Sequence, residues 1–380
     1  MEYLKDQLNN IGLVVYGLNR SPAGIGTYTR ELLGAIRSHG LEISELRAGS
    51  GKNSRDVIYL PGATLLPALL TLGQLEIGWF AHRHKLDLIH DPTGTAPLAL
   101  ASVPCIVTIH DVFPYTKPES STTLERWVYH YWLPRILPKI QHVITVSQKS
   151  KEDILKYLPI MKENVTVTPE AANAKFRVML EAEFAAVLDL YEVSFPYILS
   201  VGSIEPRKNL LRLLDAYAHL RDWSEKWNLV IVGARNFWKS TPVVETVEKL
   251  GLESCVHFTG YIPEEDLPAL YNGADLFVFP SLYEGFGLPV LEAMACGTPV
   301  VTSDSTSLPE VAGDAALLVD PYDVEAIAEA MHQILSDPDL AAELRQRDLA
   351  RAKQFTWEQT ARETIKVYER VLGQEILKSP

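Results

Sequence analysis

Short apolar runs alternate with amphipathic segments along most of the chain. The run at 11–18 is almost wholly apolar and ends in polar residues, and the segment 26–40 that follows has apolar positions at helical spacing. Apolar runs of this length that alternate with helices are typical of a parallel sheet covered by helices on both faces. The sequence therefore predicts an α/β fold. Further strand candidates in this half of the chain lie at 86–91, 104–111 and 142–147.

The alternation of strands and helices pauses at 170–195 and then starts again. The second set of apolar runs also alternates with segments of helical spacing, so we expect a second doubly wound parallel sheet. A chain of 380 residues is long enough for two domains. Predicted strands in this half lie at 197–204, 228–235, 256–262, 275–281, 299–304 and 315–321, with helices at 208–220, 264–272 and 289–296.

These patterns place the first domain at residues 1–185 and the second at 190–355. A final amphipathic helix follows, for which Thr356 is the expected N-cap residue. Ligands of such sheets bind beyond the carboxyl ends of the strands. We therefore expect the two sheets to present their strand ends to a common cleft that holds the ligand.

Charge is distributed unevenly along the sequence, whose net charge is -13. Residues 1–178 hold 19 Lys and Arg against 16 Asp and Glu, whereas the remainder holds 16 against 32. The acidic second half argues against a nucleic-acid partner. The mildly basic first half fits either an anionic acceptor, phosphorylated or membrane-borne, or ordinary variation of surface charge.

The chain lacks the features of a secreted or membrane-spanning protein. No apolar run approaches the roughly 18 residues that cross a bilayer, and the N-terminus lacks a basic segment followed by an apolar core. The three cysteines, Cys105, Cys255 and Cys296, are far apart and lie in apolar surroundings. We expect them to be buried free thiols of a cytoplasmic protein, since neither disulfide nor zinc-ligand spacing is present.

Two carboxylates flank a glycine-containing loop and a helix start in EGFGLPVLE, residues 284–292. Glu284 follows a predicted strand and Glu292 lies about one turn inside the next helix, while Gly285 and Gly287 permit unusual backbone conformations. The N–H groups of a helix start attract anions and hydroxyl oxygens. A nucleoside-diphosphate sugar fits, because it offers hydroxyls to the carboxylates and phosphate to the N–H groups. Compensation of the helix dipole by acidic residues is the alternative.

A second segment, SVGSIEPRKNL at 200–210, carries two adjacent cations at the end of a strand. The strand runs into Gly202, and Arg207 and Lys208 precede the next helix. Arginine grips phosphate through two hydrogen bonds and lysine adds a compact charge. The pair could neutralise a diphosphate leaving group without a metal ion. A solvated basic helix start is the alternative, although cations there oppose the helix dipole.

A third segment, SPAGIGTYTREL at 21–32, contains small residues between the first strand and its helix. Gly24 and Gly26 match part of the G-x-G-x-x-G dinucleotide fingerprint, but Thr29 occupies the third glycine position. We therefore do not expect an NAD site. A loop whose backbone N–H groups approach a phosphate or a sugar is the better interpretation.

Several strands of the first half end at residues that are able to do chemistry, namely Asp91, His110 and Ser147. His110 is followed by Asp111 at the end of a buried strand, where a histidine could donate or accept a proton near neutral pH. A structural histidine bonded to the backbone is the alternative.

Taken together, these motifs resemble those of the retaining glycosyltransferases of the GT-B fold, family 4. Glu284 and Glu292 match the family's E-x7-E motif, and EGFGLPVLEAMACGTPVVTSD and VGSIEPRKN match closely. AGIGTYTREL matches less closely, because Ala23-Gly24 replaces the usual Gly-Gly, and VTPEAAN lacks the Asn-Gly turn common there. The resemblance covers nearly the whole chain and implies two Rossmann-like domains facing across a cleft. The last helix, 356–380, would pack back on the first domain.

The resemblance also implies roles for individual residues. Arg207 and Lys208 would stabilise the leaving diphosphate, and His110 would approach the donor sugar. Glu284 would hold sugar hydroxyls and Glu292 the ribose hydroxyls. Other positions implied in binding the donor are Gly202, Gly285, Phe286, Gly287, Leu288, Gly24, Gly26, Arg235, Gly260 and Tyr261.

The expected activity is transfer of a hexose from a sugar nucleotide to a hydroxyl of a glycan or lipid-linked acceptor, with retained configuration and without metal or cofactor. The segment TSDSTSLPEVAGDAALLVDP resembles bacterial mannosyltransferases, which favours GDP-mannose over a UDP-sugar. A sugar-nucleotide epimerase, an NAD-dependent oxidoreductase and a non-catalytic sugar-nucleotide-binding subunit are the alternatives. A peripheral contact of the first domain with the inner face of the membrane stays open, since no basic amphipathic helix clearly supports it.

Overall fold

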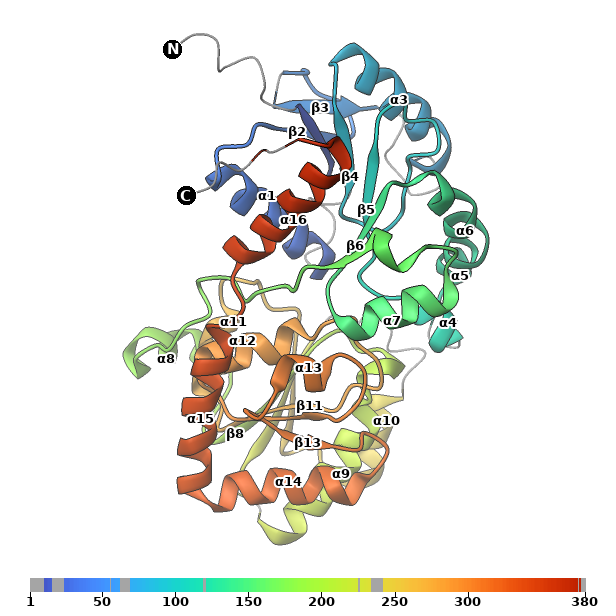
Figure 1. The fold of residues 1–380 in the computed structure, drawn as a ribbon. Coiled ribbons are helices and arrows are strands. Elements are labelled where there is room, and N and C mark those ends of the chain that lie inside the picture. The colour runs from blue at the N-terminus through green and yellow to red at the C-terminus, as the bar shows by residue number, and fades with distance from the viewer. Residues whose placement is uncertain are drawn as a thin grey trace. The chain divides into compact units, whose positions relative to one another are not determined.

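The computed structural model describes residues 10–15, 24–54, 56–61, 69–118, 121–224, 226–233, 242–374 and 376. The chain forms two compact units (Figure 1). Unit 1 contains the residues up to Glu170 and those from Thr356 onward, and unit 2 is the continuous segment Ala171–Phe355.

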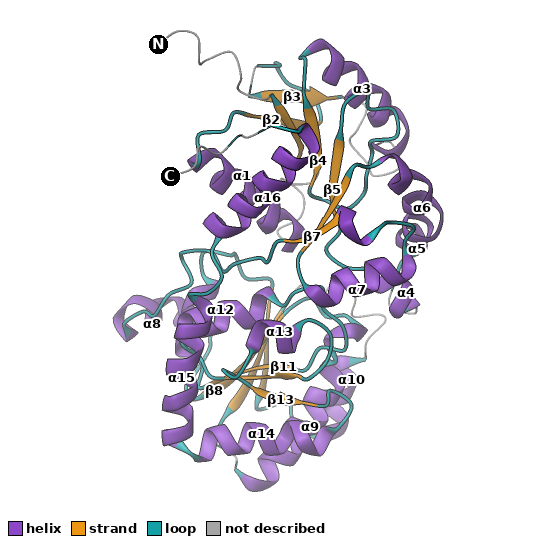
Figure 2. Cartoon of the chain, viewed as in Figure 1, coloured by secondary structure: helices purple, strands orange, loops and turns teal. Residues whose placement is uncertain are grey.

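Unit 1 is built on a parallel sheet in the order β3-β2-β1-β4-β5-β6-β7 (Figure 2). The order of strands reverses between β1 and β4, which makes this pair the topological switch point of the sheet. The strands are β1 (Ile11–Val14), β2 (Ile43–Ala48), β3 (Val57–Leu60), β4 (Leu88–Asp91), β5 (Cys105–Thr108), β6 (His142–Thr145) and β7 (Val165–Val167).

Helices cover both faces of the sheet of unit 1. The helices α1 and α16 pack against each other on one face, and α3, α6 and α7 contribute to the apolar core on the other. The helical elements are α1 (Gly24–Ser38), η1 (Leu69–Gly73), α3 (Gln74–Arg83), α4 (Phe113–Thr116), α5 (Thr123–Trp127), η3 (Val128–Trp132), α6 (Leu133–Ile136), η4 (Leu137–Lys139), α7 (Gln148–Tyr157), η5 (Lys162–Asn164) and α16 (Trp357–Leu372).

The C-terminal helix α16 belongs to unit 1. Its N-cap residue is Thr356, whose hydroxyl accepts a hydrogen bond from the backbone N–H of Gln359. The hydroxyl of Thr360 donates to the carbonyl of Pro169 at 2.5 Å, and the side chain of Tyr368 is fully buried. Side-chain burial along one face of α16 thus completes the core of a unit whose strands end about 190 residues earlier in the chain.

Unit 2 is built on a parallel sheet in the order β10-β9-β8-β11-β12-β13, with its switch point between β8 and β11. The α/β fold expected for both halves is confirmed. The elements are α8 (Glu181–Leu190), β8 (Tyr197–Val201), η6 (Pro206–Lys208), α9 (Leu210–Trp223), β9 (Asn228–Val232), α10 (Val243–Leu250), β10 (Val256–Gly260), α11 (Leu267–Gly273), β11 (Leu276–Phe279), α12 (Leu288–Cys296), β12 (Val300–Ser303), α13 (Leu308–Ala312), β13 (Leu317–Val319), α14 (Val324–Ser336) and α15 (Pro338–Ala352).

Residues 171–185, which the sequence pattern assigned to the first domain, lie in unit 2. Their contacts explain the difference. The backbone N–H of Met179 donates to the side chain of Asn272 at 2.7 Å, the ammonium of Lys175 lies 2.9 Å from the carboxylate of Glu264, and α8 packs on α11. The apolar periodicity of α8 gave no information about which sheet it covers.

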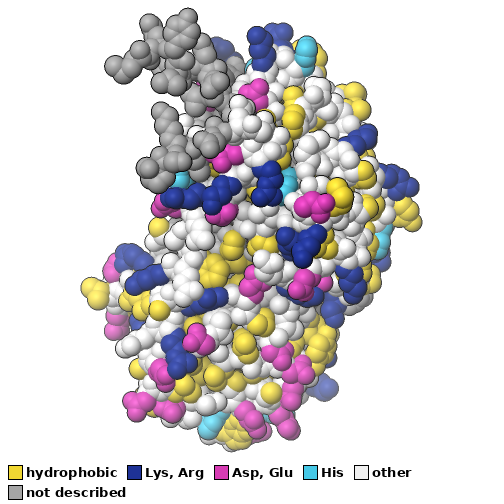
Figure 3. All heavy atoms as spheres, viewed as in Figure 1, with side chains coloured by type: hydrophobic (Ala, Val, Ile, Leu, Met, Phe, Trp, Pro, Cys, Tyr) yellow, Lys and Arg dark blue, Asp and Glu magenta, His cyan; other side chains and the backbone are white. Residues whose placement is uncertain are grey.

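The three cysteines are buried free thiols, as predicted. Burial, together with the nearby charge of Asp91, raises the pKa of the Cys105 thiol to about 12. No helix within the described ranges is both long and apolar enough to cross a bilayer. Side chains of both charges are spread over the face shown in Figure 3, and acidic ones are frequent over unit 2.

Candidate active site

Two loops at the switch point of unit 2 carry the residues that the sequence motifs single out. The first loop leads from β8 through Gly202 and η6 to Asn209, and the second leads from β11 through Glu284 to the start of α12. Because β8 and β11 are neighbours in a parallel sheet, their carboxyl ends lie side by side. Ligands of such sheets bind at this position.

Arg207, Lys208 and Glu284 form a compact charged cluster at this position. The ammonium of Lys208 lies 2.6 Å from one carboxylate oxygen of Glu284, and Nη1 of Arg207 lies 3.0 Å from the other. The hydroxyl of Ser281 also donates to Glu284, at 2.5 Å. The carboxylate therefore receives charge-assisted hydrogen bonds on both oxygens, from residues that are far apart in the sequence.

The surroundings of the cluster alter the protonation of its members. Burial would raise the pKa of Glu284, but the charges of Lys208 and Arg207 and the hydrogen bonds outweigh it and lower the pKa below its ordinary value. Burial and the neighbouring charge of Arg207 lower the pKa of Lys208, against the attraction of Glu284. Glu284 is therefore an ionised carboxylate at neutral pH, held between two cationic side chains.

Lys208 is held from two further directions. Its ammonium lies 4.6 Å from the centre of the Phe279 ring, a cation–π contact, and its side-chain stem passes Gly202. The neighbouring Arg207 is fixed by Glu205, whose carboxylate accepts from Nε at 2.8 Å. The ammonium has three donors, of which the bond to Glu284 uses one.

Backbone hydrogen bonds and one asparagine join the two loops. The carbonyl of Arg207 accepts from the backbone N–H of Leu282 at 2.7 Å, and the hydroxyl oxygen of Ser281 lies 2.9 Å from it. Asn209 has a left-handed backbone, with φ of 61°, and its amide donates to the carbonyls of Pro280 and Pro321. The cations therefore stand on a loop that is bonded directly to the loop that carries Glu284.

The start of α12 adds backbone donors beside the cluster. Gly287 has φ of 124°, and a Cβ atom there would lie 2.8 Å from a methyl carbon of Leu308, so that only glycine fits. No side chain caps the helix start at Gly287. The hydroxyl of Ser307 fixes the entering chain: it lies 2.6 Å from the carbonyl oxygen of Phe286 and 2.9 Å from that of Glu284, and its one proton can serve either. Pro289 has no N–H, and the N–H groups of Val290 and Leu291 donate to the carbonyl of Gly287. The backbone donors that can serve an anionic or hydroxyl ligand at this helix start are therefore those of Gly287 and Leu288.

Glu292 lies within α12, in the second turn after Gly287. The hydroxyl of Tyr271 donates to its carboxylate at 3.0 Å, and Tyr271 is itself fully buried, with its hydroxyl pKa raised by burial and by the charge of Glu292. The motif therefore places two carboxylates on either side of one helix start. Each carboxylate is oriented by a hydroxyl donor.

The other predicted residues of unit 2 lie partly beside the cluster and partly at the far edge of the sheet. Gly285 and Phe286 are buried in the loop after Glu284. Gly260, with φ of 76°, ends the edge strand β10, which is separated from β8 by β9, and the side chain of Tyr261 is half exposed. Arg235 lies outside the described residues.

The predicted residues of unit 1 lie around the carboxyl ends of its central strands. His110 uses both ring nitrogens: Nδ1 lies 3.2 Å from the carboxylate of Glu170, and Nε2 donates to the carbonyl of Pro92 at 3.0 Å. Burial lowers its pKa, but the hydrogen bond and charge of Glu170 outweigh burial and raise it. Gly24 and Gly26 occupy the first turn of α1, so they belong to the helix and not to a loop before it.

Asp91 and Ser147 have local structural roles. The carboxylate of Asp91 is fully buried and accepts bonds from the backbone N–H groups of Thr93 and Ala96 at 3.0 and 2.6 Å. The hydroxyl of Ser147 caps α7 by accepting from the N–H of Ser150. Both residues therefore shape the loops that follow their strands.

Sequence reasoning missed Glu205, Asn209, Ser281 and Ser307, which orient the charged cluster. The quoted motifs contained Glu205 and Asn209, and an asparagine directly before a helix is a signal for a left-handed turn. The bond from Ser281 to Glu284 stays inside one loop, whereas Ser307 contacts Glu284 and Phe286 from a loop more than 20 residues later, so no sequence motif predicts either contact.

Two sequence profiles match the chain in succession. The profile described as Glycosyltransferase Family 4 matches residues 22–176, and the profile described as Glycosyl transferases group 1 matches residues 192–351. The O-antigen chain mannosyltransferase B of Escherichia coli is 36% identical over 307 residues, with 80% of each protein covered. The chain belongs to glycosyltransferase family 4. The family resemblance inferred from the motifs is confirmed, and this family 4 protein is a glycosyltransferase.

Two further similarities extend this result. The family 4 chain is 29% identical over 311 residues to the MMP alpha-(1->4)-mannosyltransferase of Mycolicibacterium hassiacum, covering 77% of this chain and 72% of that protein. The crystal structure of Anabaena Alr3699/HepE in complex with UDP-glucose shares the fold, with a TM-score of 0.75 at 19% identity over 95% of this chain and 99% of the other. The glycosyltransferase thus has the two-sheet architecture that the resemblance implied.

Proposed function

We propose that this glycosyltransferase moves a mannosyl group from GDP-mannose to a hydroxyl of a glycan or lipid-linked acceptor, with retained configuration and without a metal ion. The observation that carries the proposal is the cluster of Arg207, Lys208 and Glu284 beside the start of α12. Both the leaving diphosphate and the sugar hydroxyls find complementary groups there.

The cations would act on the leaving group. As the glycosidic bond to the diphosphate breaks, negative charge grows on the phosphate oxygens, and a positioned cation stabilises that charge more in the transition state than in the ground state. Burial of Lys208 strengthens this effect because it removes competing water. Two fixed cations supply charge that other enzymes obtain from a divalent metal ion, which is why we expect activity without one.

The carboxylates would bind neutral hydroxyl groups. Glu284 would orient the sugar while it holds the cations in place, and Glu292 would accept hydrogen bonds from the ribose. An ionised carboxylate has about four acceptor positions, so the bonds from Lys208, Arg207 and Ser281 leave Glu284 able to accept from a sugar hydroxyl. Retention of configuration is proposed from the family resemblance.

The choice of mannose and of a nucleotide donor rests on the similar proteins. The Escherichia coli and Mycolicibacterium relatives are named as mannosyltransferases. The Anabaena neighbour was crystallised with UDP-glucose, a sugar nucleotide. A mannosyl donor is therefore favoured for this chain, with a UDP-sugar as the alternative.

A thermal-shift series with UDP, GDP, ADP, dTDP and NAD tests the proposal. A ligand present at about 100 times its dissociation constant stabilises the folded protein by about 2.7 kcal/mol. We expect stabilisation by GDP above all others. Stabilisation by UDP alone would reject GDP-mannose but keep the transferase site, and stabilisation by NAD alone would reject the site. With the donor base known, transfer from the labelled sugar nucleotide in excess EDTA tests metal independence directly.

A further inference from the structure

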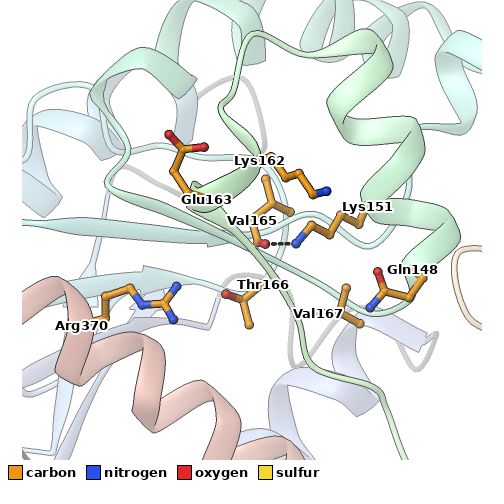
Figure 4. A pocket seen from close by; sticks show the side chains of 8 residues that line it. All are labelled: Gln148, Lys151, Lys162, Glu163, Val165, Thr166, Val167 and Arg370. Atoms are coloured by element: carbon orange, nitrogen blue, oxygen red, sulfur yellow. Dashed lines mark hydrogen bonds between the residues drawn. The ribbon is translucent and has the colours of Figure 1, made fainter.

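A basic pocket lies on unit 1, on the outer side of the edge strand β7. Its volume is about 590 Å³, and its walls come from α7, η5, β7 and α16. All four elements belong to unit 1, so the pocket is complete within a single compact unit. The residues that line it are Gln148, Lys151, Lys162, Glu163, Val165, Thr166, Val167 and Arg370 (Figure 4).

Three cations from three different elements surround this pocket. Lys151 comes from α7, Lys162 from η5 and Arg370 from the last turn of α16. No carboxylate of the described chain pairs with any of the three. Figure 4 shows the guanidinium of Arg370 directed toward Thr166, while the carboxylate of Glu163 points away from it. The pocket therefore concentrates positive charge that the described carboxylates of unit 1 do not neutralise through an ion pair.

The protonation of neighbouring groups reflects this concentration of charge. Burial lowers the pKa of Lys151, and the charges of Lys162 and Arg370 lower it further. Burial also lowers the pKa of His142, to about 4, assisted by the charges of Arg370 and Lys151. The three positive charges repel one another, as their effects on these pKa values show. An anion bound between them would relieve the repulsion.

Hydrogen-bonding groups stand among the cations. The ammonium of Lys151 donates to the carbonyl of Val165 at 2.5 Å, which fixes that cation against β7. The hydroxyl of Thr166 lies 2.8 Å from Nε2 of His142, which is neutral at physiological pH. The bond to Val165 uses one of the three donors of the Lys151 ammonium, so a ligand oxygen can meet the remaining ones beside those of Lys162 and Arg370.

We propose that this pocket binds the phosphate group of an organic phosphate monoester, held by Lys151, Lys162 and Arg370. A phosphate monoester carries about -1.5 to -2 charges near neutral pH, which balances the three cations and Glu163. Its tetrahedral oxygens accept hydrogen bonds from several directions, and arginine adds a bidentate grip. The pocket is largely open to solvent, so the organic part of the ligand can extend out of it.

Protection of the sheet edge is the competing explanation for these cations. Lysines beside an edge strand discourage pairing with another chain, and the bond from Lys151 to Val165 covers part of that edge. Lys162 and Arg370 make no hydrogen bond to β7 among the described contacts. Protection of the sheet edge thus explains the position of Lys151 only. A bound anionic ligand explains the positions of all three cations.

The test compares two double variants with equal loss of charge. Lys162→Glu with Arg370→Glu reverses two pocket cations, and Arg362→Glu with Lys366→Glu reverses two exposed cations of α16 outside the pocket. The probes are glycerol 3-phosphate, measured by calorimetry, and phosphatidylcholine vesicles containing phosphatidic acid, measured by flotation. The two probes carry the same phosphate group, once free and once in a lipid headgroup.

We expect the pocket variant to bind the effective probe at least about tenfold more weakly, or about 1.4 kcal/mol, while the control variant stays within about twofold of wild type. Binding of glycerol 3-phosphate would identify a soluble ligand, and binding of vesicles alone would identify a lipid headgroup. Equal binding by the pocket variant and wild type, or no binding of either probe, would overturn the proposal. Dimerisation of the pocket variant without loss of binding would assign the cations to edge protection.

Discussion

Each unit holds a buried polar cluster near the switch point of its sheet, but the two clusters use opposite chemistry. In unit 2, Arg207, Lys208 and Glu284 are ionised and joined by salt bridges. In unit 1, His90 has its two nitrogens 2.8 Å from the hydroxyls of Tyr368 and Thr108, and burial together with the charge of His110 lowers its pKa to about 3.

The difference indicates that one cluster contributes to stability and the other to ligand binding. The neutral cluster of unit 1 is fully buried and its imidazole nitrogens are both satisfied, so it contributes to the stability of the unit. The ionised cluster of unit 2 lies beyond the strand ends, beside a helix start without a side-chain cap. Burying ionised side chains costs free energy. A buried ionised cluster at such a position is therefore expected to bind a charged ligand.

The largest expected effect is on catalysis. Lys208→Ala removes a cation beside the leaving diphosphate, and loss of one such contact lowers turnover by about 10² to 10³. Steady-state kinetics with the identified donor measure the change, and circular dichroism checks the fold. Lys249→Ala, at an exposed lysine of α10, is the matched control. Turnover of Lys208→Ala within about threefold of wild type would refute the phosphate role.

The second effect is on the stability of unit 1. Tyr368→Phe removes the hydroxyl that meets Nδ1 of His90 and leaves that nitrogen buried without a partner, which costs about 1 to 3 kcal/mol. Urea denaturation monitored on unit 1 measures the loss, while turnover should hardly change. Tyr131→Phe removes a half-exposed hydroxyl of the same unit as a control. If Tyr368→Phe left stability unchanged and reduced turnover, the cluster of unit 1 would have a role in catalysis and not in stability.

A third effect separates the two carboxylates of the motif. Glu292→Gln should weaken binding of the nucleoside diphosphate by about tenfold, or about 1.4 kcal/mol, because a neutral amide accepts ribose hydroxyls less strongly. Isothermal titration calorimetry measures it, with Glu329→Gln on the exposed side of α14 as the control. The ribose assignment fails if affinity is unaltered.

The smallest effect is a pH dependence of unit 1. The pKa of His110 is raised in the folded state, because Glu170 outweighs burial. Its stabilisation is thus fully present below the unfolded value, about 6.5, and is lost as the pH rises through the higher folded value. Unfolding free energies measured from pH 6 upward should decline in wild type. The decline should be smaller in His110→Gln, and identical slopes would exclude this ion pair as its source.

Sequence patterns predicted much of the architecture, and the failures have physical causes. The strands β1, β8 and β11 are nearly continuous apolar runs, which is the signature of a strand buried on both faces. The strand β2 contains Glu45 and Arg47 in ISELRA and was missed. The carboxylate of Glu45 is buried there because Arg37 and Arg47 pair with it, a compensation that periodicity does not reveal.

In the candidate site, too, some residues were predictable from the sequence and others were not. Glu284, Arg207 and Lys208 were found because their residue types are unusual at strand ends, and the structure brings them into contact. The structural partners of His110 were not predictable, since Glu170 and Pro92 lie on other loops of unit 1 and only folding brings them together. Short motifs thus identify groups with chemistry, whereas the residues that orient them come from the tertiary fold.

The discontinuity of unit 1 has a consequence for how the protein is made. During synthesis, the whole of Ala171–Phe355 emerges between β7 and α16. Unit 2 is continuous and can fold as soon as it is complete, but the sheet of unit 1 must wait with Tyr28 and His90 exposed on the face that α16 later covers through Trp357 and Tyr368. The half of the protein that is translated first is therefore the half that finishes folding last.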